Sequence, residues 1–181
     1  MENTRRSIYN RPEGTKMIRS TSQPAAHPAL PAAPSKTAEK FPLRIPMALK
    51  EAVEAVARNQ YRSFNSEVAL AVISQFEGHR RLITMRNSLV NRLGAKVGKE
   101  VISRFERIDP DAGTKHTLNI RFPDGVRDEL REFSNTSQSV SMRDMVANAC
   151  ADWVLYSNQI EALLARCGDP DIRFPAQGVR H

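Results

Sequence analysis

The sequence predicts a mainly α-helical fold with a short two-stranded antiparallel β-ribbon. One observation is that apolar and polar side chains alternate over residues 40–45 and again over residues 117–122, which is the period of a strand. Another is that each alternating segment is followed by a proline and then by two stretches with apolar residues at helical spacing. The order strand, proline, helix, polar turn, helix therefore occurs twice, which indicates an internal repeat of topology.

The 181 residues suffice for one domain of ordinary size or for two small ones. They include 27 Lys and Arg against 20 Asp and Glu, which gives a net charge of +7. A basic chain is attracted to polyanions such as nucleic acid or an anionic membrane surface. Neither the hydrophobic region of a signal peptide nor an apolar run of about 18 residues occurs, so we expect a cytoplasmic protein without a membrane span.

Residue types that carry chemistry are sparse. The chain has two cysteines, Cys150 and Cys167, and Cys150 lies in an apolar helical pattern that is typical of a buried free thiol. The four histidines are scattered without the spacing of metal ligands, and neither a glycine-rich phosphate loop nor a nucleophile elbow occurs. We therefore expect no enzymatic activity, no cofactor and no metal site.

The first repeat is predicted over residues 39–78. Every second residue from 41 to 45 is apolar, and Pro46 ends the strand at a position that suits the start of a helix. The polar run RSFNSE at 62–67 separates two helices and caps the second one, which is expected to end at Gly78.

The second repeat is predicted over residues 115–164. Its strand ends at Pro123, and a short helix follows. The polar run at 135–141 supplies capping residues for a long helix, whose apolar stripe starts at Met142.

Three segments flank or join the repeats. Residues 1–38 are rich in Pro, Ser and basic residues without any period, which predicts a disordered arm that is either a solvated tail or a loose phosphate-binding segment. Residues 79–114 form a predicted helical connector, in which 79–107 carry eight Lys and Arg against two acids. The connector is either a basic face near phosphates or a pair of ordinary helices packed on the core. Residues 165–181 are expected to be a flexible tail.

The segments FPLRIP at 41–46 and RSFNSE at 62–67 resemble the Arc family of ribbon-helix-helix DNA-binding proteins. The resemblance is close over residues 40–77 and looser over 115–158, through LNIRFP at 118–123 and SVS at 139–141. It implies tandem ribbon-helix-helix motifs that pair their strands antiparallel over four interlocked helices. One motif alone could neither satisfy its strand nor bury a core. The family's mode of action places such a ribbon in the major groove of double-stranded DNA.

The outward residues of the two strands are the candidates for base contact, because Arg matches the acceptor edge of guanine and Asn matches the edge of adenine. They are Lys40, Arg44, Thr117, Asn119 and Arg121. Pro42 departs from the family's pattern, since it has no side-chain donor and no backbone N–H, so the first strand is expected to read fewer bases. The competing interpretation is that these residues are only the wet face of a sheet.

The turns before the second helix of each repeat are the candidates for phosphate contact, because free N–H groups at a helix N-terminus attract anions. These candidates are Arg62, Ser63, Asn65, Ser66, Lys115, Ser139, Ser141 and Arg143. Pure helix capping is the competing role for them. Arg62 and Glu67 also match two members of a buried Arg–Glu–Arg triad described for Arc, whose third position is Ala71 here.

The two strands can pair within one chain, giving a pseudo-dimer that reads two unequal half-sites, or between two chains in a homodimer, with higher-order assembly on DNA as a further arrangement. We expect pairing within the chain. The function expected is that of a transcriptional repressor. An accessory protein of conjugative DNA processing, similar to the TraY type with tandem motifs in one chain, and an antitoxin are the alternatives.

Overall fold

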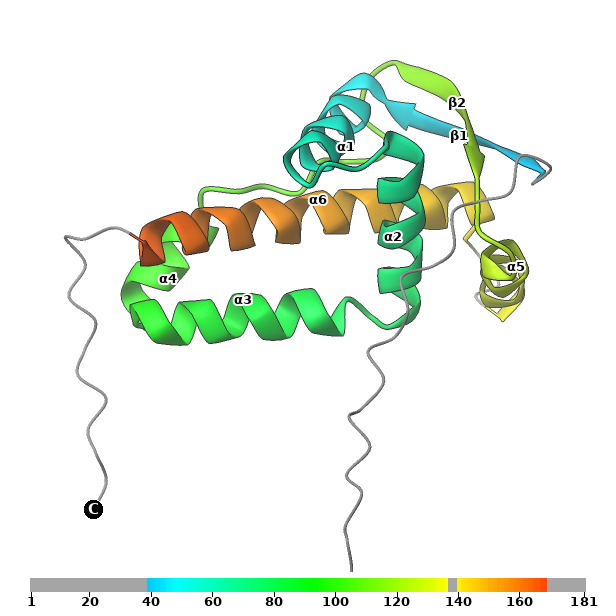
Figure 1. Ribbon diagram of the computed structural model, residues 1–181. Helices are drawn as coiled ribbons and strands as arrows, with labels where there is room; N and C mark the ends of the chain where they lie inside the picture. The colour runs from blue at the N-terminus through cyan, green and yellow to red at the C-terminus, as the bar shows by residue number, and fades with distance from the viewer. Residues whose placement is uncertain (1–38, 137–139, 169–181) are drawn as a thin grey trace, which may run out of the picture. The chain divides into compact units, whose positions relative to one another are not determined.

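The computed structural model describes residues 39–136 and 140–168 (Figure 1). The predicted arm at 1–38, the candidate Ser139 and residues 169–181 of the predicted tail lie outside these residues. The chain forms two strands and six helices within the described part. In order they are β1 (Lys40–Pro46), α1 (Met47–Asn59), α2 (Phe64–Phe76), α3 (Arg80–Leu93), α4 (Ala95–Ile102), β2 (Lys115–Arg121), α5 (Val126–Thr136) and α6 (Met142–Cys167). The predicted fold class, mainly helical with a two-stranded antiparallel sheet, is confirmed.

The two strands pair with each other within the chain. Their antiparallel register places Phe41 opposite Ile120 and Leu43 opposite Leu118. Phe41, Leu43 and Ile120 are almost fully buried, so one side of the ribbon faces the helices as the alternation predicted. Phe122, which follows β2, packs its ring 5.4 Å from that of Phe41 and closes this side of the ribbon.

The main core lies between the ribbon and helices α1, α2, α5 and α6. Its fully buried side chains include Leu49 of α1, Val72 of α2, Leu130 of α5 and Val146 of α6. Figure 1 shows α6 passing beneath α1 and the ribbon, with α2 packed across it. Each repeat thus contributes a strand and two helices to one shared core.

Helix boundaries follow the local signals that the sequence predicted. Pro46 precedes α1, and its missing N–H costs nothing there because the first N–H groups of a helix have no partner inside it. The side chains of Ser63 and Ser141 accept hydrogen bonds from the backbone N–H groups of Ser66 and Asp144, which caps α2 and α6. Helix α6 continues to Cys167, so its last three residues lie in the segment that had been predicted as a flexible tail.

Helices α3 and α4 occupy the predicted connector and pack on the second half of α6. Leu93, Val101 and Leu163 form the centre of this smaller apolar cluster. Gly98 of α4 lies against Val90 of α3 so closely that an added Cβ atom would stand 2.8 Å from Val90. The connector is therefore a packed helical hairpin.

The described residues show no helix long and apolar enough to cross a membrane. They also contain no group of three or more His, Cys, Asp or Glu side chains that could hold a metal ion. Cys150 is a buried free thiol, as its place in the apolar pattern predicted, and burial raises its pKa to about 12.

Candidate nucleic-acid interface

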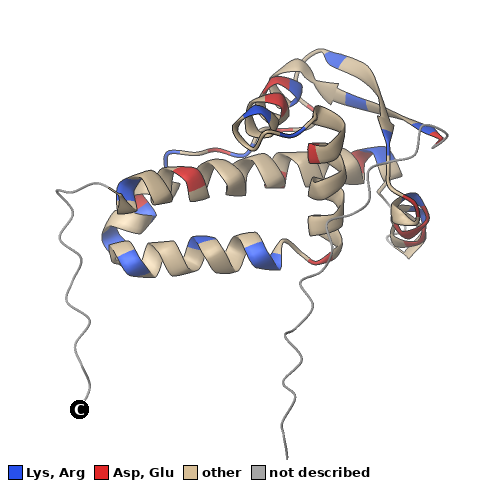
Figure 2. Cartoon of the chain, viewed as in Figure 1, with Lys and Arg blue, Asp and Glu red and all other residues tan. Residues whose placement is uncertain are grey.

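The outward side of the ribbon carries the predicted base-contacting residues together on one surface. Lys40, Arg44, Thr117 and Asn119 are exposed, while Arg121 is half-buried. Between Lys40 and Arg44, the third outward residue of β1 is Pro42. The outward positions hold basic, amide, hydroxyl and proline side chains and no acid, and Lys and Arg, blue in Figure 2, recur along both strands.

The register of the ribbon is symmetric about one pair of residues. Pro42 stands opposite Asn119, with Lys40 opposite Arg121 on one side and Arg44 opposite Thr117 on the other. When LNIRFP at 118–123 is aligned with FPLRIP at 41–46, Asn119 corresponds to Pro42 and Arg121 to Arg44. Equivalent positions therefore lie at equal distances from the central pair, as in two copies of one strand related by a twofold axis.

Pro42 does not interrupt the ladder. Pairing continues on both sides of it, from Lys40–Arg121 to Pro46–Lys115. In a two-stranded sheet each strand has one free edge, so a residue without an N–H group is tolerated where that group would face outward. At the centre of the outward face, β1 therefore presents an apolar pyrrolidine ring and β2 presents the Asn119 amide.

The N-terminus of α2 is attached to the end of β2 by Asn65. The Asn65 amide donates to the backbone oxygen of Arg121 at 2.7 Å and its side-chain oxygen accepts from the Arg121 backbone N–H at 2.7 Å. The side chain predicted to contact phosphate thus binds the protein's own backbone. Ser63 and Ser66 lie beside it, with their hydroxyl oxygens 2.8 Å apart.

Arg62 is also engaged within the protein. Its Nη1 lies 3.3 Å from Oε2 of Glu67, whose side chain is completely buried. The other carboxylate oxygen of Glu67 accepts a 2.7 Å hydrogen bond from the indole N–H of Trp153 in α6. Trp153 therefore gives Glu67 its second partner, in place of the second Arg of the Arg–Glu–Arg pattern, whose position holds Ala71 in this chain.

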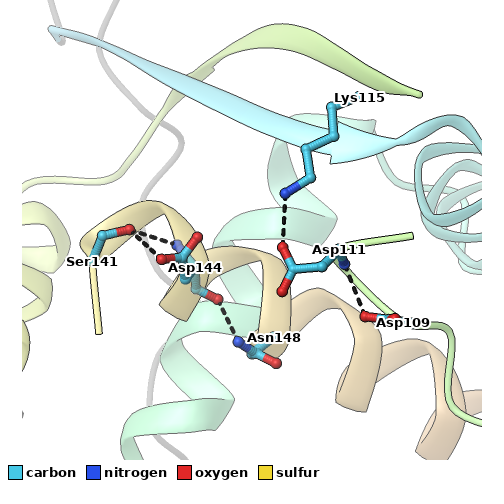
Figure 3. Close-up of polar contacts among 6 residues, drawn as sticks. All are labelled: Asp109, Asp111, Lys115, Ser141, Asp144 and Asn148. Atoms are coloured by element: carbon cyan, nitrogen blue, oxygen red, sulfur yellow. Dashed lines mark hydrogen bonds and ion pairs between the residues drawn. The ribbon is translucent and has the colours of Figure 1, made fainter. Parts of the chain in front are cut away.

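The N-terminus of α6 has a more acidic environment than the N-terminus of α2. Figure 3 shows Lys115 of β2 directed at Asp111, with Asp109 and Asp144 nearby. The Lys115 Nζ lies 2.7 Å from Asp111, and the hydrogen bond and the negative charges of the surrounding carboxylates raise its pKa. Asp144 is the first-turn acid of α6 and accepts a hydrogen bond from the Ser141 hydroxyl at 2.7 Å.

Arg143 lies in the first turn of α6 with an exposed side chain, and it makes no ion pair or hydrogen bond to another described residue. It occupies the same place after the cap Ser141 as Asn65 does after the cap Ser63. Ser141 and Arg143 thus lie at the N-terminal end of α6, and the negative charge of Asp144 at this end acts on Lys115.

Sequence reasoning missed three features of this surface. The bond from Trp153 to Glu67 was not predicted, because an indole N–H within a helix gives no periodic signal. Asn65 had been predicted to contact phosphate or to cap α2, whereas it binds the backbone of Arg121 and Ser63 caps the helix. The ion pair between Asp111 and Lys115 was not predicted either, and the spacing of four residues was the available signal for it.

The comparison with protein families finds a similarity in the first part of the chain. The model of the Arc-like DNA binding domain matches residues 35–77. Residues 35–77 are therefore similar to Arc-like DNA-binding domains. These residues contain β1, α1 and α2, and with them Lys40, Arg44 and the α2 cap. No curated protein and no solved structure matches the chain.

Proposed function

We propose that the chain is a sequence-specific regulator of transcription, acting as a repressor, that inserts the β1–β2 ribbon into the major groove of double-stranded DNA. The observation that carries this proposal is the ribbon itself, whose outward side gathers Lys40, Arg44, Thr117, Asn119 and Arg121 without an acid. A two-stranded ribbon fits the major groove, where Arg and Asn can distinguish guanine and adenine. Repression follows from occupancy of a promoter, so the chain acts by binding alone.

The proposal treats residues 115–164 as a second ribbon-helix-helix motif. Three features support it. The elements β2, α5 and α6 repeat the order of β1, α1 and α2, and Ser141 caps α6 as Ser63 caps α2. The register of the ribbon is also symmetric about the pair of Pro42 and Asn119. The partner strand of the Arc-like domain then comes from the same chain, which makes the protein a monomeric pseudo-dimer. Light scattering should give the mass of one chain at low micromolar concentration, and a stable dimer there would contradict internal pairing.

The two halves of the ribbon are expected to read DNA unequally. β2 offers Thr117, Asn119 and Arg121, all of which can bond to base edges, whereas β1 offers two cations and the apolar ring of Pro42. The ring can contact a thymine methyl group but cannot donate a hydrogen bond. The DNA site should therefore lack a palindrome, with stronger base preference on the half that contacts β2.

Phosphate contacts are proposed on both sides of the ribbon. At α2 they would come from Ser63, Ser66 and the N-terminal backbone N–H groups, because the Asn65 and Arg62 side chains are bound within the protein. At α6 they would come from Ser141, Arg143 and Lys115. The carboxylates of Asp111 and Asp144 oppose phosphate there, so we propose that the α6 side holds the DNA backbone less strongly.

Selection of bound fragments from random double-stranded DNA, at one stated salt concentration, tests the proposal. A single enriched motif without twofold symmetry is the expected result. Enrichment of no sequence above the starting pool would contradict sequence-specific binding, since contacts with phosphate alone do not select bases.

An accessory role in conjugative DNA processing is the second candidate, because strand pairing within one chain fits a protein with tandem motifs. This role requires that the protein bend its site. Electrophoretic mobility of fragments carrying the selected site at different positions distinguishes the two roles, since a bend near the middle of a fragment retards it most.

A further inference from the structure

A groove lies between the C-terminal end of α1, helix α3 and the second half of α6. Its volume is 460 Å³, within the range of about 300–1,000 Å³ that is typical of small-molecule sites. None of the ribbon residues lines it. The groove is bordered by packed helices, and spaces between the helices of a bundle are common places for ligand sites.

Apolar side chains form two walls of the groove. Leu82 and Met85 come from α3, and Ile160 and Leu164 come from α6. Met85 is 45% exposed and Leu164 is 46% exposed, so large apolar side chains remain in contact with water at the mouth. An apolar ligand body that covered them would remove this surface from water, which favours binding.

Trp153 contributes an aromatic surface that is held in place. Its indole N–H donates to the buried Glu67, so the ring is fixed while part of it lines the groove. Negative charge gathers on an aromatic face, and Trp is the side chain that attracts cations most strongly in this way.

Among the residues that the structure describes, one carboxylate of the groove has no cation as its partner. Arg62 is paired with the buried Glu67, so the two charges compensate each other. Glu161, exposed on α6, instead accepts hydrogen bonds of 3.4 and 3.3 Å from the Asn59 amide of α1, which is a neutral donor. This contact holds the Glu161 carboxylate at the groove, where it favours a positively charged ligand.

We propose that this groove binds an amphipathic organic cation, with its apolar body along Leu82, Met85 and Leu164 and its ammonium group near Glu161 and the Trp153 ring. The site goes beyond DNA binding, since every residue that forms it lies outside the ribbon. Ligand binding is measured without DNA, so a groove that binds no cation would not contradict the proposed reading of DNA. A ribbon that reads no DNA sequence would likewise not contradict the ligand site.

Trp153 is the only tryptophan of the chain, so its fluorescence reports on the groove directly. Titrations of the full chain with octyltrimethylammonium, octanoate and octanol compare three head groups on one apolar body. The cation should produce a saturable change and bind at least about tenfold more tightly than octanoate, by about 1.4 kcal/mol. Equal affinities for the cation and the anion, or a change that does not saturate, would overturn the proposal.

Two substitutions test whether the ligand binds in this groove. Glu161→Gln keeps the shape of the side chain and should weaken binding of octyltrimethylammonium at least about fivefold, while the weaker binding of octanol stays unchanged. Met85→Lys should weaken binding of the cation at least about tenfold by repulsion. Met47→Lys is the matched control, because Met47 is a similarly exposed methionine outside the groove. Circular dichroism checks that each variant is folded, and equal losses for Met85→Lys and Met47→Lys would exclude the groove as the site.

Discussion

Asn65 of α2 and Arg121 of β2 are joined by two hydrogen bonds of 2.7 Å, although the residues lie 56 positions apart in the chain. The two bonds join one side-chain amide to the backbone N–H and C=O groups of one residue. They position the N-terminus of α2 beside the end of the ribbon and align the backbone of the residue whose side chain is the strongest candidate for reading guanine. The geometry of the outward side of the ribbon, which we propose to contact DNA, thus depends on a contact between the first and the second repeat.

Replacement Asn65→Ala should destabilise the protein by about 1–3 kcal/mol, because it leaves the N–H and C=O groups of Arg121 without their partner. Urea unfolding followed by circular dichroism measures this loss. Asn59→Ala is the matched control, since Asn59 also makes two side-chain hydrogen bonds, but exposed ones with longer distances. Equal losses in the two variants would contradict a special role for the Asn65 contact.

Trp153→Phe should destabilise the fold by about 1–3 kcal/mol, because it removes one of the two partners of the completely buried Glu67 carboxylate. The loss should shrink in a Glu67→Gln background, where no buried charge needs the indole N–H. A double-mutant cycle by urea unfolding separates this coupling from the change in ring volume. Additive losses would show that the hydrogen bond contributes nothing.

His79 should make stability depend on pH. Burial lowers its pKa below 6.5, and the negative charge of Asp152 only partly opposes this. Its Nδ1 lies 2.9 Å from the Ser74 hydroxyl, and its ring packs at a tilt against the ring of Tyr156. Arg86 lies over the Tyr156 ring. The pKa is lower in the folded than in the unfolded chain, so this contribution to stability is complete above pH 6.5 and is lost as the pH falls through the folded-state value.

The check is the free energy of unfolding of the wild type and of His79→Asn between pH 8 and pH 5, about the range over which a histidine changes charge. Asn suits the left-handed backbone at this position, where φ is 52°. As the pH falls, the free energy of unfolding of the wild type should decrease more than that of the variant. A difference that is independent of pH would contradict the assignment.

Asp111→Asn should strengthen DNA binding and steepen its dependence on salt, because it removes a carboxylate from the Lys115 ammonium group. Fluorescence anisotropy of labelled DNA at several salt concentrations measures both effects. Glu100→Gln serves as the control, since it breaks a similar pair between Glu100 of α4 and Arg104, four residues further along the chain. If Glu100→Gln strengthens binding as much as Asp111→Asn does, the effect reflects only the net charge.

The sequence predicted the fold largely through local signals. Alternation around Leu43 and Ile120, prolines at 46 and 123, and the capping serines 63 and 141 each act within a few residues, and each has the predicted role. The outward side of the ribbon followed from the same alternation. These features depend on period and capping, which can be observed in one sequence without an alignment.

The remaining contacts depend on how distant segments meet. The bond between Trp153 and Glu67 joins residues 86 positions apart, and no periodic pattern encodes it. The internal use of Asn65 and Arg62 depends on which carbonyl and carboxylate groups the fold brings beside them. Both had been predicted as phosphate contacts, because a polar side chain in a turn looks the same whether its partner is phosphate or protein.

The most direct test of the account is the base preference of Arg121→Ala on the selected DNA site. Affinities of the wild type and the variant are measured by anisotropy, at one salt concentration, for the site and for each single base-pair substitution in it. The account predicts a loss of about 1–3 kcal/mol on the selected site, with discrimination lost at one base pair and kept elsewhere. A variant that kept the wild-type preference at every base pair would show that the ribbon does not read the DNA.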